Sequence, residues 1–145
     1  MTGVQTCALP ISCWVFARTA LSAGSLSRSI NASASSSPSR SVHISASQVG
    51  WDERQRVVSD DFVEQFDRAL RNVLEVVREA GGAPDDLARL VIYVTDKREY
   101  LARTAEVGER WRALMGRHYP AMALVEVKSL LDDAAKVEIE GIAVL

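Results

Sequence analysis

The sequence predicts an α+β domain: a two-layer sandwich, in the order ββ-α-β-α-ββ, with two helices covering one face of a mixed sheet. Residues 60–80 repeat apolar side chains at helical spacing, and residues 87–95 are rich in β-branched and aromatic side chains. Two further runs, 121–127 and 135–144, alternate apolar and polar residues as half-buried strands do. Because 145 residues are one domain's worth, these elements belong to a single fold.

Composition excludes several classes of function. The net charge of −2 favours neither nucleic acid nor an anionic membrane as partner, and no apolar run reaches the length of a membrane span. Cys7 and Cys13 both lie in the first 13 residues, which argues against a disulfide framework in the rest. The two histidines, His43 and His118, are far apart, so no metal site is predicted.

The charge distribution separates a leader, residues 1–42, from a domain, residues 43–145. Residues 52–145 hold all 19 acidic side chains and 14 of the 17 basic ones, whereas 1–51 hold only three arginines. We expect the leader to be non-native or disordered. Its first twelve residues resemble a translated sequencing-library adapter, and an organellar transit peptide is the alternative, since the segment is Arg/Ser-rich and acid-poor.

The first half of the domain begins with a short strand at 43–49 and a bend at 50–52, after which 55–58 could pair back as a hairpin strand. Asp61 and Glu64 have the spacing of a capping box at the start of the helix 60–80. Gly81 and Gly82 end that helix. Its predicted buried face consists of Phe62, Phe66, Leu70, Val73 and Val77.

The second half contains the strand 87–95, a turn at 96–99 and a second helix at 100–115, which Gly116 ends. The residues expected on the buried face of this helix are Leu101, Ala105, Gly108, Trp111 and Met115. A loop at 117–120 leads to the strand 121–127, and residues 130–133 connect it to the strand 135–144.

Both faces of the strand 121–127 are substantially apolar. Ala121, Ala123 and Val125 alternate with Met122 and Leu124. Two helices cover only one sheet face, so the pattern predicts self-association through the open face.

Three blocks resemble the RidA (YjgF/YER057c/UK114) family. They are ASQVGWD at 46–52, FDRALRNVLEVVREAGG at 66–82, and the closing strands PAMALVEV and VEIEGIAV. With the matching element order they cover about 100 residues. The resemblance implies a chorismate-mutase-like fold and a homotrimer with ligand clefts between subunits. It also implies a cofactor-independent hydrolase that deaminates reactive enamines and imines. We expect a cytoplasmic protein, or an organellar one if the Arg/Ser-rich leader is a genuine transit peptide.

Carried over residue by residue, the family pattern makes Glu138 the carboxylate that positions the attacking water. The family's carboxylate-binding Arg is replaced by Met122, and its Cys by Leu124. Ser47 stands at the Gly of the family's SGQ motif, and a family Asn falls near Gly108. A strand carrying a family Tyr is not recognisable. Met offers neither charge nor paired N–H donors, so we expect weakened recognition of 2-imino acids.

Each candidate residue has a structural alternative. Glu138 could instead form an ion pair with Lys136 or Lys128, and Met122 could pack at a subunit contact. Arg117 and His118 could supply the missing positive charge, or lie in a solvated loop. Trp51 could stack on a ligand, although packing is the more common role of such a residue, and Lys97-Arg98-Glu99 is expected to be a solvated helix start.

We expect a RidA-family deaminase that acts on a small imine, enamine or related ligand, with Glu138 as catalytic residue. Met122, Leu124, Ser47 and Arg117 are the expected substrate-binding residues. The alternative is a non-catalytic small-molecule-binding or interaction trimer of the same family. Neither metal, cofactor, nucleic acid nor membrane is expected as partner.

Overall fold

The computed structural model describes residues 42–44 and 47–145, so the expectation for the leader lies outside the described residues. The strands are β1 (Val42–Ile44), β2 (Gln48–Val49), β3 (Leu87–Val94), β4 (Ala121–Glu126) and β5 (Val137–Val144). The α-helices are α1 (Phe62–Glu79), α2 (Lys97–Ala102) and α3 (Thr104–Met115), with a 3-10 turn, η2, at Pro84–Asp86.

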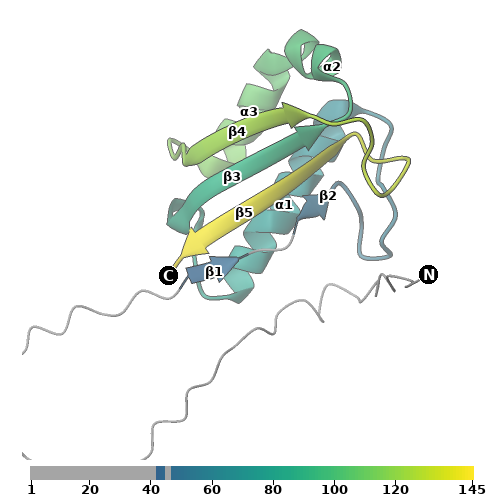
Figure 1. Cartoon of the computed structure of the whole chain (residues 1–145). Coiled ribbons are helices and arrows are strands. Elements are labelled where there is room, and N and C mark those ends of the chain that lie inside the picture. The colour runs from purple at the N-terminus through teal and green to yellow at the C-terminus, as the bar shows by residue number, and fades with distance from the viewer. Residues whose placement is uncertain (1–41, 45–46) are drawn as a thin grey trace, which may run out of the picture.

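Strand β5 is central to the sheet, whose order is β1-β5-β3-β4 with β2 also paired to β5 (Figure 1). β3 and β4 run parallel, whereas β5 is antiparallel to β1, β2 and β3. The two closing strands of the sequence are therefore not neighbours, because β3 lies between them. This mixed sheet with helices confirms the predicted α+β class.

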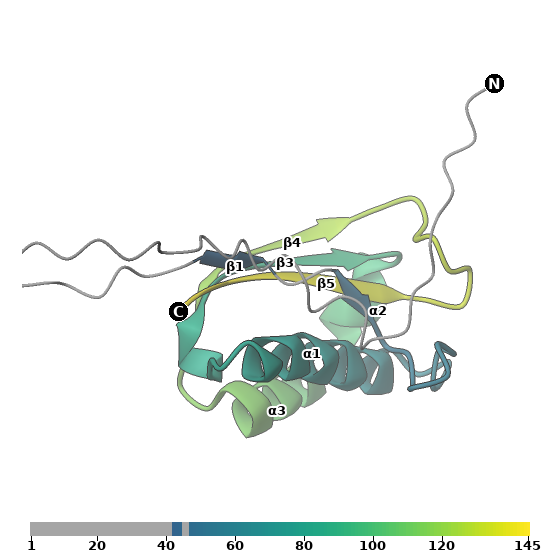
Figure 2. The ribbon, with the colours of Figure 1, turned by 90° about the horizontal axis from the view of Figure 1, so that it is seen from below.

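The helices lie on one side of the sheet, as Figure 2 shows with α1 and α3 below the strands. The predicted apolar face of α1 is confirmed, because its five residues are at most 3 % exposed. Alternate residues of β5 point into this core, and Val137 and Ile139 are completely buried there. Glu138 and Glu140 are consequently placed on the opposite, open face of the sheet.

The start and end of α1 follow the predicted chemistry. Asp61 caps the helix, since its Oδ1 accepts the backbone N–H of Glu64 at 3.0 Å. Gly81 ends the helix with φ +90°, a backbone conformation that residues other than glycine rarely adopt. The Arg103 guanidinium, 2.8 Å from Asp61, holds the pKa of that carboxyl below its usual range.

The prediction of one helix at 100–115 is wrong in its extent. A helix already begins after Asp96, which caps it by accepting the N–H of Arg98. This helix ends at Ala102, and Arg103 separates it from α3. The Arg103 side chain bonds Glu106 and Asp61, which stabilises this break. As a result Leu101 is 62 % exposed, and the buried residues of α3 are Val107, Trp111 and Met115.

The predicted strand at 43–49 is described as two short strands, β1 and β2, that both pair with β5. The segment 55–58 pairs back as predicted, but over a shorter length than a strand. An antiparallel bridge joins Trp51 to Val57, and the backbone N–H groups of Asp52 and Val58 donate to the carbonyls of Arg56 and Gly50. Asp52 closes the turn by accepting the N–H groups of Arg54 and Arg56.

Gln65 ties α1 to the chain that precedes β5. This fully buried side chain donates to the carbonyls of Ser59 and Ala134, at 2.6 and 2.9 Å, and accepts the N–H of Lys136 at 2.8 Å. The polar atoms of the Gln65 side chain would otherwise be buried without partners. The start of β5 is therefore held against α1 at a defined register.

Gly50 follows β2, and we predict that this glycine is required for the chain to pass close to α1. A Cβ at this position would lie 2.7 Å from the Cα and carbonyl oxygen of Gln65, which are backbone atoms. We expect Gly50→Ala to lower the free energy of unfolding by about 1–3 kcal/mol in chemical denaturation. Gly108→Ala is the control: the nearest atom is a flexible Arg112 nitrogen at 3.5 Å, so stability should be unchanged or raised by about 0.5–1 kcal/mol. Equal losses in both variants would contradict the steric explanation.

Candidate functional site

Glu138 occupies the open face of the sheet between two neighbouring strands. Its partner in β3 is Tyr93, and its partner in β2 is Val49, which is 7 % exposed. Side chains of directly paired residues share a face, so this half-buried carboxylate lies between an aromatic ring and an apolar side chain.

No hydrogen bond or ion pair engages the Glu138 carboxylate within the described part of the chain. The alternative of an ion pair with Lys136 does not occur, because Lys136 Nζ lies 2.7 Å from Glu99 instead. The carboxylate is consequently available to a water or a ligand.

Two residues that sequence reasoning missed shape the surroundings of Glu138. The Tyr93 hydroxyl donates to Glu140 Oε2 at 3.3 Å on the same face. Asn72 of α1 donates through Nδ2 to the carbonyls of Val49 and Trp51, at 3.0 and 3.2 Å, and so ties the end of β2 to α1. The alternation of the strand 87–95 was the available signal for Tyr93, but the strand pairing that brings it to Glu138 is not visible in sequence.

Met122 and Leu124 lie on the other face of the sheet. Their parallel partners in β3 are Leu90 and Ile92, which point into the core beneath the helices. Both side chains are nevertheless exposed, at 46 % and 36 %, because β4 is the edge strand. Within one chain, the structure does not bring these residues together with Glu138.

Ser47 immediately precedes β2, whose residues Gln48 and Val49 pair with Ile139 and Glu138, so Ser47 lies beside the part of β5 that carries Glu138. Arg117, by contrast, is exposed in the loop before β4, at the strand end remote from Val125, which neighbours Tyr93.

The remaining polar candidates have structural contacts. His118 is half-buried, and its Nε2 donates to the carbonyl oxygen of Leu87 at 2.7 Å, which anchors the loop to β3. Trp51 is also half-buried and donates through Nε1 to Gln48 at 3.3 Å. Lys97 and Arg98 are exposed at the start of α2, as expected for a solvated helix start.

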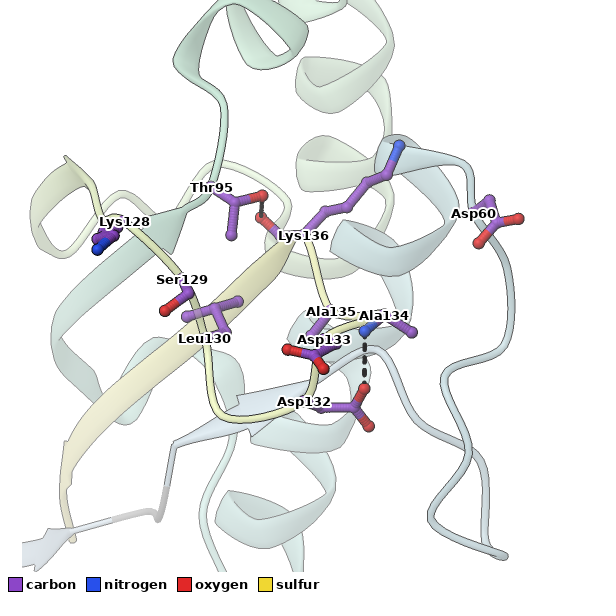
Figure 3. Close-up of a pocket in the computed structure, with 10 residues that line it drawn as sticks. All are labelled: Asp60, Thr95, Lys128, Ser129, Leu130, Asp132, Asp133, Ala134, Ala135 and Lys136. Carbon is purple, nitrogen blue, oxygen red and sulfur yellow. Dashed lines mark hydrogen bonds between the residues drawn. The ribbon is translucent and has the colours of Figure 1, made fainter.

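A shallow hollow of about 370 Å³ lies beside the loop between β4 and β5 (Figure 3). Residues of segment 128–136, together with Asp60 and Thr95, line it. Glu138 is not part of its wall. The lining mixes lysines with aspartates, and Asp132 is already used to accept the Ala134 N–H. We therefore place the candidate site on the open sheet face.

The described residues contain no group of three or more His, Cys, Asp or Glu side chains that could hold a metal ion. None of the helices in that same part of the chain has both the length and the apolar character needed to cross a bilayer.

Comparison with known proteins identifies the family. A family model described as endoribonuclease L-PSP matches residues 23–145. A RutC family protein of Pyrococcus abyssi is 30 % identical over 91 residues, which are 63 % of this chain and 68 % of that protein.

Solved structures agree with this match. A member of the YjgF/YER057c/UK114 family from Mycobacterium tuberculosis is 32 % identical with a TM-score of 0.58, covering 72 % of this chain and 79 % of that one. The YjgF gene product of E. coli is 31 % identical with a TM-score of 0.61, over 71 % of this chain and 80 % of that one. The family model covers most of the chain, and the fold matches the solved structures. This chain therefore belongs to the RidA (YjgF/YER057c/UK114) family.

Proposed function

We propose that this protein is a cofactor-independent enamine/imine deaminase, which hydrolyses a reactive C=N bond to a carbonyl compound and ammonia. The observation that carries the proposal is Glu138. Its carboxylate is half-buried on the open sheet face and has no hydrogen bond or ion pair within the described residues. Such a carboxylate is suited to act as a general base on a bound water.

The chemistry needs one water and one proton carrier. Glu138 accepts a proton from the water as the water oxygen bonds to the imine carbon, and it passes this proton to the imine nitrogen, which gives a neutral carbinolamine. Glu138 then carries the hydroxyl proton of the carbinolamine to its amino group as the C–N bond breaks, so that the carbonyl compound and ammonia leave and the carboxylate is restored. An enamine follows the same course after protonation at carbon gives the imine.

Met122 bears on the class of substrate. A thioether provides neither charge nor N–H donors, so it cannot hold a carboxylate as an arginine fork does. Met122 and Leu124 instead offer exposed apolar surface. We therefore assign the protein a substrate that lacks an α-carboxylate and presents an apolar substituent.

We further propose that the protein acts as a homotrimer with its sites between subunits. Glu138 and Met122 lie on opposite faces of the sheet of one chain, so a site that uses both requires a second copy. Strand β4 is exposed along its whole length although five of its six residues are apolar. Burial of such a strand against another subunit would remove this apolar surface from water.

The absence of the arginine also favours a second candidate function, a non-catalytic trimer that binds a small apolar molecule. Met122 and Leu124 would serve that role without any contribution from Glu138. The two candidates differ in turnover, which the kinetic experiments below measure.

Assembly through the open face is tested by Val125→Glu. Val125 is 43 % exposed on the open face of β4, and a carboxylate there would be buried without a partner in an assembled trimer. By light scattering we expect the unmodified chain at about three times its mass of 15.9 kDa and the variant as a monomer. Leu131→Glu, at a side chain 89 % exposed in the β4–β5 loop, should stay trimeric. A monomeric unmodified chain would refute the assembly.

Glu138→Gln tests the proposed reaction. With a neutral aryl ketimine as substrate and its absorbance as the signal, we expect kcat to fall about 100-fold, because the amide cannot accept the proton. KM should change little. Glu75→Gln, on an exposed part of α1, is the control and should leave kcat unchanged. Turnover by the unmodified chain no faster than in buffer would favour the non-catalytic candidate.

Met122→Arg tests the assignment of substrate class. For 2-iminopropanoate generated in situ we expect KM to fall about 10- to 100-fold, since a charge-assisted bond contributes about 1.5–3 kcal/mol. The uncharged control Met122→Gln should not show this gain. If the arginine variant handles 2-iminopropanoate no better than the unmodified chain, residue 122 does not determine selectivity for a carboxylate.

A further inference from the structure

A row of side chains crosses the open face of the sheet through Tyr93. Its partner in β4 is Val125 and its partner in β5 is Glu138, beyond which lies Val49 of β2. Tyr93 is half-buried in this row. It is thus the only hydroxyl in the row that contains the proposed catalytic carboxylate.

The Tyr93 hydroxyl does not reach across to Glu138. It reaches diagonally to Glu140, the next open-face residue of β5, and donates to Oε2 at 3.3 Å. Diagonal neighbours on a sheet face are within reach of long aromatic side chains. Among the described residues, Glu140 therefore accepts a hydrogen bond from a side chain, whereas Glu138 does not.

The surrounding groups together raise the pKa of the Tyr93 phenol. Burial raises the pKa of Tyr93, and the charge of Glu140 and its hydrogen bond raise it further. Glu138 adds to the rise of this pKa, whereas Arg89 on the same strand opposes it. From β4 the row receives only the apolar Val125. The phenol therefore keeps its proton and remains a donor at neutral pH.

We propose that Tyr93 is a positioning residue for the proposed C=N hydrolysis: its hydroxyl holds Glu140 in place, so that Glu138 alone presents a carboxylate to the attacking water. The inference rests on the proposed function. Without the hydrogen bond from Tyr93 to Glu140, the carboxylates of Glu138 and Glu140 would compete for the same water.

Tyr93→Phe in the full-length chain removes the hydroxyl and keeps the ring. We expect kcat for the aryl ketimine to fall about tenfold, with KM within about twofold. The thermal midpoint should fall by only a few degrees, because one hydrogen bond is lost while the packing of the ring is kept. Glu140→Gln retains an acceptor for Tyr93 and should lose less. Tyr119→Phe is the matched control, since Tyr119 is 62 % exposed and stacks on Trp111.

An absorbance titration of the three tyrosines reads the contact independently of turnover. One tyrosine should ionise at higher pH than usual, and this step should be lost in Tyr93→Phe. Glu140→Gln should move the step to lower pH, because removing the negative charge makes the phenolate less unfavourable.

The outcomes separate the two proposals. An active chain that tolerates Tyr93→Phe without loss of kcat overturns the positioning role alone. An inactive unmodified chain overturns the proposed function and, with it, the catalytic part of this inference. A titration that Glu140→Gln leaves unchanged overturns the Tyr93–Glu140 contact itself, whatever the activity.

Discussion

Alternate burial of the β5 side chains beneath α1 is the constraint on which the rest of the structure depends. Val137 and Ile139 are completely buried in the core, and the period of two along a strand then places Glu138 and Glu140 on the open face. A slip of one residue would reverse both faces, which the apolar core opposes. Gln65 stabilises the same register at the start of the strand, since its amide bonds Lys136 and the carbonyl of Ala134.

The two closing strands of the chain have different roles in the sheet. Among the strands that the structure describes, β5 is central and pairs with three others, whereas β4 pairs only with β3 and is exposed throughout. An apolar edge strand of this kind is a liability in an isolated chain, because its free backbone groups and side chains invite association. In the proposed trimer, a second subunit would cover the apolar side chains of β4 that a single chain leaves exposed.

The chemistry of the open face depends on how its two carboxylates differ. Glu140 accepts a hydrogen bond from Tyr93, while Glu138 lies between the Tyr93 ring and the buried Val49. Met122 and Leu124 contribute apolar surface from the opposite face of the edge strand. The proposed catalytic residue and the residue proposed to select the substrate therefore lie on different strands, so a substitution at Met122 leaves the Glu138 carboxylate in place.

The sequence by itself determined the α+β class, the core face and N-cap of α1, and the alternation that puts Glu138 on the face opposite the core, because each depends on local periodicity or capping chemistry. It did not predict the break at Arg103, since the ion pair with Asp61 joins residues 42 apart. Nor could it show that Tyr93 lies beside Glu138, or that Met122 and Glu138 are on opposite faces. Those relations follow from the pairing of β3 with both β4 and β5, which only tertiary structure decided, because strand partners are chosen by packing between distant segments.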